Sequence, residues 1–217
     1  MSEAIDWLNS EAISLWGAPV SWAEVVGAVT GLLAVWWTTR QHVWNWPMGI
    51  LNSAIFMIVF LDVKLYASAF LQIVFIGLGS YGWWAWTHHD ASRVERSIRR
   101  TSRVEWIAMS SIGIVVLAAW TTWLTTGTDS PAPLWDALTL TLSLLATYGQ
   151  AQKLIESWWI WIAVDLISVP LYLSRHLYPT AALYVVFGLL CALGLHDWHR
   201  TLRGSAAPLP LLEVAAP

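Results

Sequence analysis

A few polar side chains lie deep inside long apolar stretches of this sequence, and Asp165 is the most unusual of them. Asn52, Gln72 and Tyr184 lie at a similar depth, about two helical turns inside their own stretches. Asp165 has no Lys or Arg in the middle of any stretch to pair with. It must therefore be protonated, held by a hydrogen-bond network, or met by a cationic ligand. Buried polar residues can line a cavity or simply join neighbouring helices, and both interpretations remain open.

Tryptophan is the second residue type that could bind a ligand here. The chain contains 18 tryptophans, and their ring faces attract cations. Most lie near the ends of the apolar stretches, where membrane proteins carry an aromatic belt. Trp161 lies about one turn deeper than its neighbours, and Trp46 is the second candidate. Together with Asp165, such rings would suit a flat, positively charged heteroaromatic compound.

The remaining clusters give weaker signals. His88-His89-Asp90 and the run from His196 to His199 contain metal-ligand residue types, but both lie at the ends of apolar stretches, where polar residues gather. The chain lacks a Gly-rich phosphate loop and a Gly-x-Ser-x-Gly motif. We expect no catalytic residue, no metal and no cofactor. A membrane-embedded enzyme that uses His196, Asp197 and His199 is the rival class, and a structural membrane subunit is another.

Composition identifies the class of protein that must position these groups. Of 217 residues, 57% are hydrophobic and 12% are charged, and the mean hydropathy is +0.56. Soluble domains are about 25% charged, so an ordinary soluble enzyme and a disordered chain are both excluded. The net charge of −3 gives no basic surface for nucleic acid, and the single cysteine, Cys191, cannot form an internal disulfide. We infer an all-α integral membrane protein.

Seven stretches have the length and hydropathy of transmembrane helices, which need about 20 mostly apolar residues. A short amphipathic helix is expected to precede them at residues 1–17, with Ile5, Leu8, Ala12 and Leu15 at helical spacing. The seven stretches are about Ser21–Thr38, Trp44–Leu61, Leu65–Thr87, Val104–Thr126, Leu134–Tyr148, Trp158–Ser174 and Pro179–Asp197.

The basic residues predict the orientation, because Lys and Arg concentrate in cytoplasmic loops. The segment Asp90–Arg103 carries five arginines, so we place it in the cytoplasm. Alternation of seven helices then puts nine of the 11 basic residues inside and leaves only Lys64 and Arg175 outside. The amino terminus is predicted to lie outside and the carboxyl terminus in the cytoplasm.

An internal repeat relates two parts of the chain. Shifted by 112 positions, Leu65–Phe75 aligns with Leu177–Phe187. The same shift aligns Gly82 with Gly194 and Trp86 with Trp198, and it pairs Gln72 with Tyr184 and Ser53 with Asp165. Equivalent helices are four apart, so both copies run in the same direction. Parallel three-helix repeats are a known transporter plan, with the substrate bound near the midplane.

The expected organisation is three helices, one linking helix and three helices. Its segments are 1–17, an interfacial helix; 18–89, the first three-helix repeat; 90–133, a basic cytoplasmic loop and the linking helix; 134–199, the second three-helix repeat; and 200–217, a cytoplasmic tail.

Several motifs resemble the PnuC family of bacterial vitamin transporters, from about Ser21 to Trp198. They include Ser21-Trp22-x-Glu24-x-x-Gly27, Gly49-x-x-Asn52, Leu65-Tyr66-Ala67-Ser68, Leu71-Gln72, Tyr81-Gly82-Trp83-x-x-Trp86, Trp161 and Ile167-Ser168-Val169. The resemblance implies homotrimers of seven-helix protomers in the bacterial inner membrane. It also implies facilitated uptake of nicotinamide riboside, which a cytoplasmic kinase traps by phosphorylation.

The resemblance implies that Asn52, Gln72, Trp161 and Tyr184 belong to a substrate-binding layer, to which we add Trp46, Asp165 and Ser168. The family commonly has Asn where this chain has Asp165, and its members are thought also to carry thiamine, riboflavin or deoxynucleosides. An acidic residue suits the cationic vitamins, nicotinamide riboside and thiamine, better than neutral riboflavin. We expect a passive transporter of nicotinamide riboside, with thiamine or another vitamin as the alternative.

Overall fold

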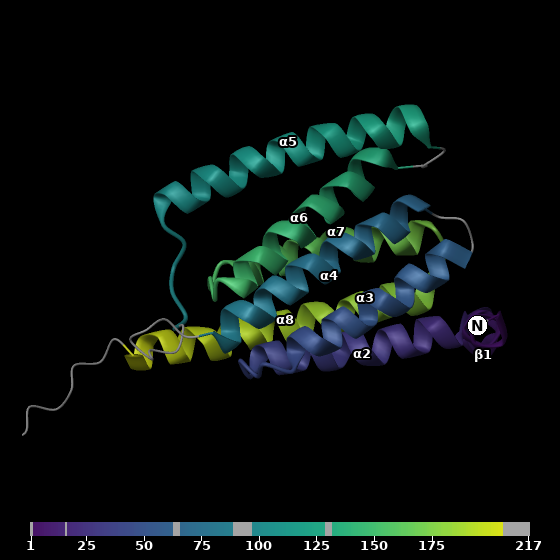
Figure 1. Cartoon of the computed structure of the whole chain (residues 1–217), viewed down its shortest axis with the longest axis horizontal. Helices are drawn as coiled ribbons and strands as arrows, with labels where there is room; N and C mark the ends of the chain where they lie inside the picture. The colour runs from purple at the N-terminus through teal and green to yellow at the C-terminus, as the bar shows by residue number, and fades with distance from the viewer. Residues whose placement is uncertain (1, 16, 63–65, 89–96, 129–131, 206–217) are drawn as a thin grey trace, which may run out of the picture.

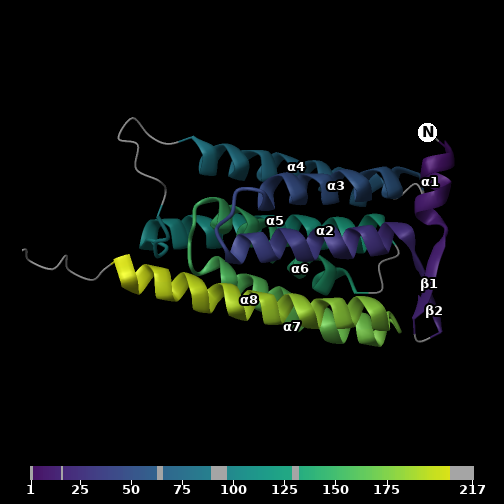
Figure 2. The ribbon, with the colours of Figure 1, turned by 90° about the horizontal axis from the view of Figure 1, so that it is seen from below.

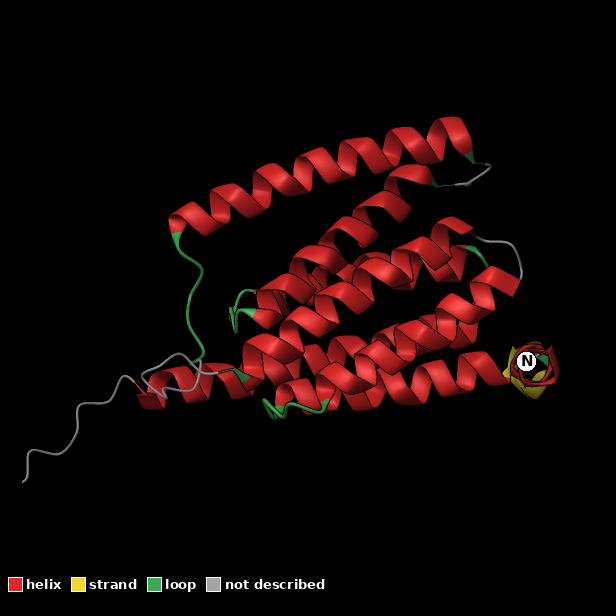
Figure 3. Cartoon of the chain, viewed as in Figure 1, coloured by secondary structure: helices red, strands yellow, loops and turns green. Residues whose placement is uncertain are grey.

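The computed structural model describes residues 2–15, 17–62, 66–88, 97–128 and 132–205. In this described part of the chain, seven long helices run back and forth along one direction (Figures 1 and 3). Residues 89–96, which include His89, Asp90 and part of the expected basic loop, and residues 206–217 of the expected tail lie outside the described residues. The helices are α2 (Trp22–Thr39), α3 (Asn45–Asp62), α4 (Tyr66–Thr87), α5 (Arg103–Gly127), α6 (Pro133–Ala151), α7 (Ser157–Ser174) and α8 (Tyr178–Ser205).

The amino-terminal segment differs from the expected helix over 1–17. Helix α1 covers only Ser2–Asn9, and strands β1 (Glu11–Leu15) and β2 (Ala18–Ser21) form an antiparallel hairpin beside it (Figure 2). Ser10 ends the helix, since its hydroxyl turns back to the carbonyl of Trp7 at 2.7 Å. Gly17 then takes a positive φ of 81° in the hairpin turn. Glycine adopts this φ without steric cost, so the chain reverses direction at Gly17 and the helix does not continue through this segment.

Each long helix coincides closely with an apolar stretch, apart from two ends. Helix α6 continues three residues past Tyr148 to Ala151, and α8 continues past Asp197 to Ser205. No proline follows Asp197 until position 208, so nothing breaks the helix where the apolar residues end. Residue 200, the expected start of a tail, is therefore helical.

Two helices begin at the same local motif. Ser21 caps α2 and Ser102 caps α5, and in each a Glu three residues later bonds back to the cap. The amide of Glu24 donates to the Ser21 hydroxyl at 3.2 Å, while the amide of Ser21 donates to the Glu24 carboxylate at 2.8 Å. This reciprocal pair satisfies amide groups that a helix start leaves open.

Three helices are long and apolar enough to cross a membrane by length and composition: Arg103–Gly127, Ser157–Ser174 and Tyr178–Gly204 among the described residues. A shorter apolar helix covers Asn45–Leu61. Helix α5 lies at one edge of the bundle and packs mainly on α6 (Figure 1). Many of its large apolar side chains are exposed, and Val104 and Ile107 are 76% and 68% exposed. Such a surface is typical of a protein that contacts lipid.

Helices that correspond at the 112-residue shift pack in the same way in both groups. Helix α3 packs between α2 and α4, and α7 packs between α6 and α8. The two groups meet through α2 against α8 and through α4 against α6. Since α2 corresponds to α6 and α4 to α8 at this shift, these two contacts are equivalents of each other.

Two matching tryptophan pairs form the core at one end of this bundle. Trp46 and Trp86 meet edge to face with ring centres 5.4 Å apart, and Trp158 and Trp198 do the same at 5.4 Å. Each pair has a glycine beside it, because a Cβ added to Gly82 would overlap the Trp46 ring and one on Gly194 would overlap the Trp158 ring. A close aromatic–glycine packing therefore occurs twice.

The same end of the bundle carries most of the described basic residues, including Arg40, Arg99, Lys153 and Arg200, and we call it the basic end. The opposite end, beside β1 and β2, is the hairpin end (Figure 2). The α2–α3 and α6–α7 turns lie at the basic end and share one backbone shape, with φ of 54° at Gln41 and 52° at Lys153.

Candidate functional site

Asn52 lies near the middle of α3 and joins this helix to α2. Its Nδ2 donates to the carbonyl of Gly27 at 2.8 Å and to the hydroxyl of Thr30 at 2.7 Å. The Gly27 carbonyl can only accept, which fixes the orientation of the amide group. Both amide protons are therefore committed to α2, and Oδ1 is the atom left to meet a ligand.

Phe187 brings α8 to the same place. A Cβ added to Gly31 would lie 3.2 Å from the Phe187 ring and 3.9 Å from Nδ2 of Asn52. The absence of a side chain at Gly31 thus lets α2, α3 and α8 approach one another beside Asn52. Because α8 belongs to the second group of helices, this point lies where the two groups meet.

Asp165 occupies the middle of α7, eight residues after Ser157 and nine before Ser174. It is 5% exposed and packs against α8, where an added Cβ on Gly188 would be 3.7 Å from its Oδ2. The Cys191 thiol is within hydrogen-bonding reach of the carboxyl group. Oδ2 is nevertheless buried without a hydrogen-bond partner among the described residues.

The inward face of α7 carries further polar groups at helical spacing. Nε1 of Trp161 is also buried without a partner in the described part of the chain. Ser168 continues this face, three residues after Asp165, and is 2% exposed. Buried polar atoms are almost always satisfied in folded proteins, so two unpartnered atoms one helical turn apart indicate a place for water or a ligand.

Tyr184 belongs to an aromatic group beside this face. Its ring centre lies 5.1 Å from that of Tyr172 and 5.8 Å from that of Phe187. One turn further along α8 than Tyr184, Gly188 lies against Asp165. Asn52, Phe187, Tyr184 and Asp165 are thereby linked through neighbouring contacts across α2, α3, α7 and α8. We call these four residues the central layer.

Two expected site residues lie differently. Gln72, on α4, is half-buried, and Asn52 donates to Gly27 and Thr30 rather than to Gln72. Trp46 is 4% exposed and packs on Gly82 and Trp86 at the basic end. Its Nε1 is buried and unpartnered within the described chain. Their membership of a binding site remains a prediction.

A segment that precedes α5 packs against the α6–α7 turn at the basic end. The amide of Arg99 donates to the carbonyl of Lys153 at 3.1 Å, and the amide of Ile155 donates back to the Arg99 carbonyl at 3.1 Å. The amide and hydroxyl of Thr101 both donate to the Glu156 carboxylate, at 2.9 and 2.8 Å. Segment 99–101 is thus pinned to the α6–α7 turn.

Charged side chains make further contacts at the basic end. Lys153 is 2% exposed, and its Nζ lies 4.8 Å from the centre of the Trp86 ring, a cation–π contact. Arg99 donates to both carboxylate oxygens of Glu105, at 2.8 and 2.5 Å, and this hydrogen-bonded pair raises the pKa of the Arg99 guanidinium. Segment 99–101 is therefore held against the α6–α7 turn at the basic end by backbone and side-chain contacts.

Comparison with known proteins identifies the family. A family model described as "Nicotinamide mononucleotide transporter" matches residues 21–200. The chain belongs to this family. Its relatives in the comparison are transporters, and membership confirms the resemblance to PnuC proteins that the sequence motifs indicated.

Two curated proteins align with this chain over most of their length. The riboflavin/roseoflavin transporter RibM of Streptomyces davaonensis is 31% identical over 216 residues, covering 97% of this chain and 99% of RibM. The nicotinamide riboside transporter PnuC of Escherichia coli is 24% identical over 212 residues, covering 86% of this chain and 89% of that protein. The relatives thus differ in the vitamin they are named for.

A solved structure has the same fold. The crystal structure of the vitamin B3 transporter PnuC matches with a TM-score of 0.67 at 21% identity, over 84% of this chain and 83% of that one. The helical architecture described above is therefore that of a known transporter structure.

Sequence reasoning missed several members of the site. Gly27, Thr30 and Gly31 position Asn52, and Gly188 and Cys191 receive Asp165. Gly27 and Gly31, four residues apart on one apolar stretch, are a visible signal for close helix approach. The spacing of residues within one helix does not tell which other helix packs against these glycines, because that depends on how the two helix groups are arranged.

Proposed function

We propose that this chain is a facilitative transporter that carries nicotinamide riboside down its concentration gradient, without ATP and without an obligatory coupling ion. The observation that carries the proposal is the inward face of α7, where Oδ2 of Asp165 and Nε1 of Trp161 are buried and unpartnered among the described residues. A buried carboxylate without a basic partner favours a cationic ligand, and a pyridinium ring is one.

Each residue of the proposed site has a distinct role. Asp165 attracts the pyridinium charge or accepts from the carboxamide, and Trp161 and Tyr184 stack on the ring. Oδ1 of Asn52, oriented by its two bonds to α2, accepts from a ribose hydroxyl. Gln72, Ser168 and Trp46 complete the predicted set as groups that the ligand reaches in at least one state of the transport cycle.

The proposed architecture is seven transmembrane helices in a 3+1+3 arrangement, with α5 as the linking helix. The repeated tryptophan–glycine packing and the equivalent turns at Gln41 and Lys153 support it. Basic residues at one end support an orientation with that end in the cytoplasm of a bacterial cell and the amino terminus outside. Homotrimeric assembly and trapping by a cytoplasmic kinase are proposed from the family resemblance, and mass measurement in detergent tests the first.

Transport requires that the site open to each side in turn, and the two helix groups supply the moving parts. The central layer lies where they meet, and segment 99–101 packs against the α6–α7 turn at the basic end. We propose that rocking of one group against the other exposes the site alternately, as in transporters built from repeats.

Riboflavin is the second candidate substrate, and similarity to RibM over nearly the whole chain favours it. A neutral flavin would use the same aromatic faces, and its ribityl chain would take the place of ribose at Asn52. In that case Asp165 would act as a hydrogen-bonding group and its charge would not select the ligand.

Calorimetric titration of the purified protein with nicotinamide riboside, thiamine, riboflavin and nicotinamide mononucleotide separates these candidates. We expect tightest binding of nicotinamide riboside. Asp165→Asn should weaken it by about 1.5–3 kcal/mol, the value of a hydrogen bond to a charged group, and should leave riboflavin unaffected. Asp197→Asn removes the same charge at the basic end and should change nothing. Tight binding of riboflavin alone would replace the first candidate with the second.

A further inference from the structure

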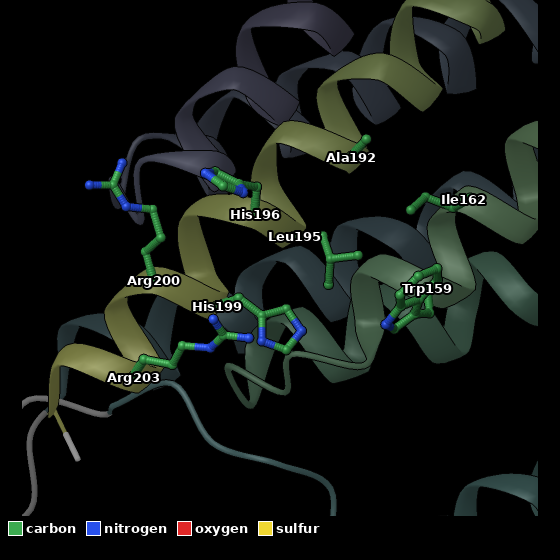
Figure 4. A pocket seen from close by; sticks show the side chains of 8 residues that line it. All are labelled: Trp159, Ile162, Ala192, Leu195, His196, His199, Arg200 and Arg203. Carbon is green, nitrogen blue, oxygen red and sulfur yellow. The ribbon is translucent and has the colours of Figure 1, made fainter. Parts of the chain in front are cut away.

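A groove on the outer surface of α7 and α8, away from the central layer, is lined partly by apolar and partly by basic side chains. Its volume is about 440 Å³, and it lies at the basic end (Figure 4). One part is apolar, and the exposed ring of Trp159 (58% exposed) forms its wall. The apolar lining consists of Trp159 and Ile162 from α7 and Ala192 and Leu195 from α8.

The other part of the groove is basic. His196, His199, Arg200 and Arg203 line it from α8, and no acidic side chain is among the lining residues. Neither Arg200 nor Arg203 has a hydrogen-bond or ion-pair partner among the described residues. The guanidinium group of Arg203 points toward His199 and that of Arg200 points away from it (Figure 4), and both are available to an anion.

The two parts are arranged along the direction of the helices. Ala192, His196, His199 and Arg203 recur at spacings of three and four on one face of α8, so the lining changes from apolar to basic over about 16 Å of helix. That length equals about one leaflet of hydrocarbon. A phospholipid has the same order of parts, with acyl chains below and a phosphate above.

The basic lining of the groove is not a requirement of the repeated fold, because the first repeat has other residues at the equivalent positions. Shifted back by 112 positions, the equivalents of Ile162, His196, His199 and Arg200 are Ile50, Trp84, Thr87 and His88. The first repeat therefore has the corresponding helix surface without the arginine. The basic groove is a property of the second repeat.

We propose that the groove between α7 and α8 binds one anionic phospholipid, with the phosphate on Arg200 and Arg203 and an acyl chain against Trp159, Ile162 and Leu195. Charge complementarity selects the lipid, since basic side chains at the membrane surface attract anionic headgroups. The apolar half of the groove favours an intact lipid over a free phosphate. The proposed site is separate from the vitamin site, and it does not depend on which vitamin is carried.

Native mass spectrometry of the delipidated protein in detergent tests the proposal with dioleoyl-phosphatidylglycerol and dioleoyl-phosphatidylcholine. We expect phosphatidylglycerol to bind at least tenfold more tightly. The double variant R200Q/R203Q should weaken its binding about 30-fold, from about fivefold per arginine, and R200K/R203K should retain most of it. The matched control R100Q/R103Q removes two exposed arginines at the start of α5 and should bind as the wild type does.

Three results would overturn the proposal: equal binding by R200Q/R203Q and the wild type, equal binding of the two lipids, or displacement of phosphatidylglycerol by an equal concentration of glycerol 1-phosphate. The last would show that the arginines bind a free phosphate. Melting temperatures of the variants in lipid-free detergent verify folding. Since no vitamin is present, the outcome is independent of the proposed transport activity.

Discussion

Trp86 and Trp198 each donate an indole hydrogen bond to the opposite helix group, and their rings lie 6.5 Å apart. Trp86 donates to the carbonyl of Gln150, and Trp198 donates to the carbonyl of Thr38, both at 3.2 Å. Trp86 also shares its proton with the carbonyl of Ala151 at 3.2 Å. The donors are 112 positions apart, and so are Gln150 and Thr38. The two bonds are therefore symmetry equivalents that cross between the helix groups at the basic end.

Replacing either tryptophan by phenylalanine keeps the ring and removes the donor. For Trp86→Phe and Trp198→Phe we expect a similar loss of about 0.5–1.5 kcal/mol each, the net contribution of one hydrogen bond. Thermal unfolding in detergent measures it. Trp44→Phe, at a position 57% exposed, should leave the melting temperature unchanged. A large loss for only one of the two core variants would contradict their equivalence.

Gly82 lies against the Trp46 ring, and an added methyl group has no space there. Gly82→Ala should destabilise the protein by about 1–3 kcal/mol, the usual cost of overpacking. Gly77→Ala in the same helix is the control, because a Cβ at Gly77 meets no atom within 4 Å. Both variants make the same change in helix propensity, so equal melting temperatures would show that the close packing at Gly82 is absent.

The long helices could be predicted from the sequence because length and hydropathy decide whether a segment is a helix in an apolar solvent. The aligned Gly82 and Gly194 also gave the correct equivalence, since each receives a tryptophan ring. The prediction of a helix over residues 1–17 was wrong beyond Asn9. Ile13 and Leu15 fit helical spacing, but the turn at Gly17 and the strand pairing with Val20 and Ala18 prevailed there.

The site was less predictable. The depth of Asn52 and Asp165 follows from counting residues along a helix, but their neighbours come from other helices. Asn52 is held by Thr30, and Asp165 faces Gly188. Gln72 aligned with Tyr184 in the repeat, but the hydrogen bonds that hold the central layer at Asn52 go to Gly27 and Thr30. Equivalence in a repeat relates positions across the two groups without making them neighbours.

Thr30 supports Asn52 without being part of the proposed ligand contacts. Thr30→Val removes one of the two acceptors of Nδ2, so stability should fall by about 0.6 kcal/mol, the mean for such bonds between membrane helices. Vitamin affinity should fall as well, because Oδ1 is then less well oriented. Thr38→Val is the matched control, since its hydroxyl bonds only within α2, to Ala34. Calorimetric titration and thermal melting of the two variants check this, and an unchanged affinity for Thr30→Val would argue against the positioning role.

Glu156 holds the segment that packs against the α6–α7 turn at the basic end. Glu156→Ala removes the acceptor of the Thr101 amide, and hydrogen exchange at that amide should become at least tenfold faster. The neighbouring amide of Ser102 bonds to Glu105 and serves as the internal control, with unchanged exchange. Unchanged protection at Thr101 would mean that the contacts between Arg99 and Lys153 hold this segment by themselves.

The most direct test of the transport proposal is the movement of vitamin into proteoliposomes that contain only the purified protein. With no ATP and no ion gradient, labelled nicotinamide riboside should equilibrate faster than in protein-free vesicles and reach equal concentrations inside and outside. Asp165→Asn should slow this entry, and Asp197→Asn should not. Failure to accelerate the entry of nicotinamide riboside, thiamine or riboflavin, in protein whose melting curve shows that it is folded, would contradict the account.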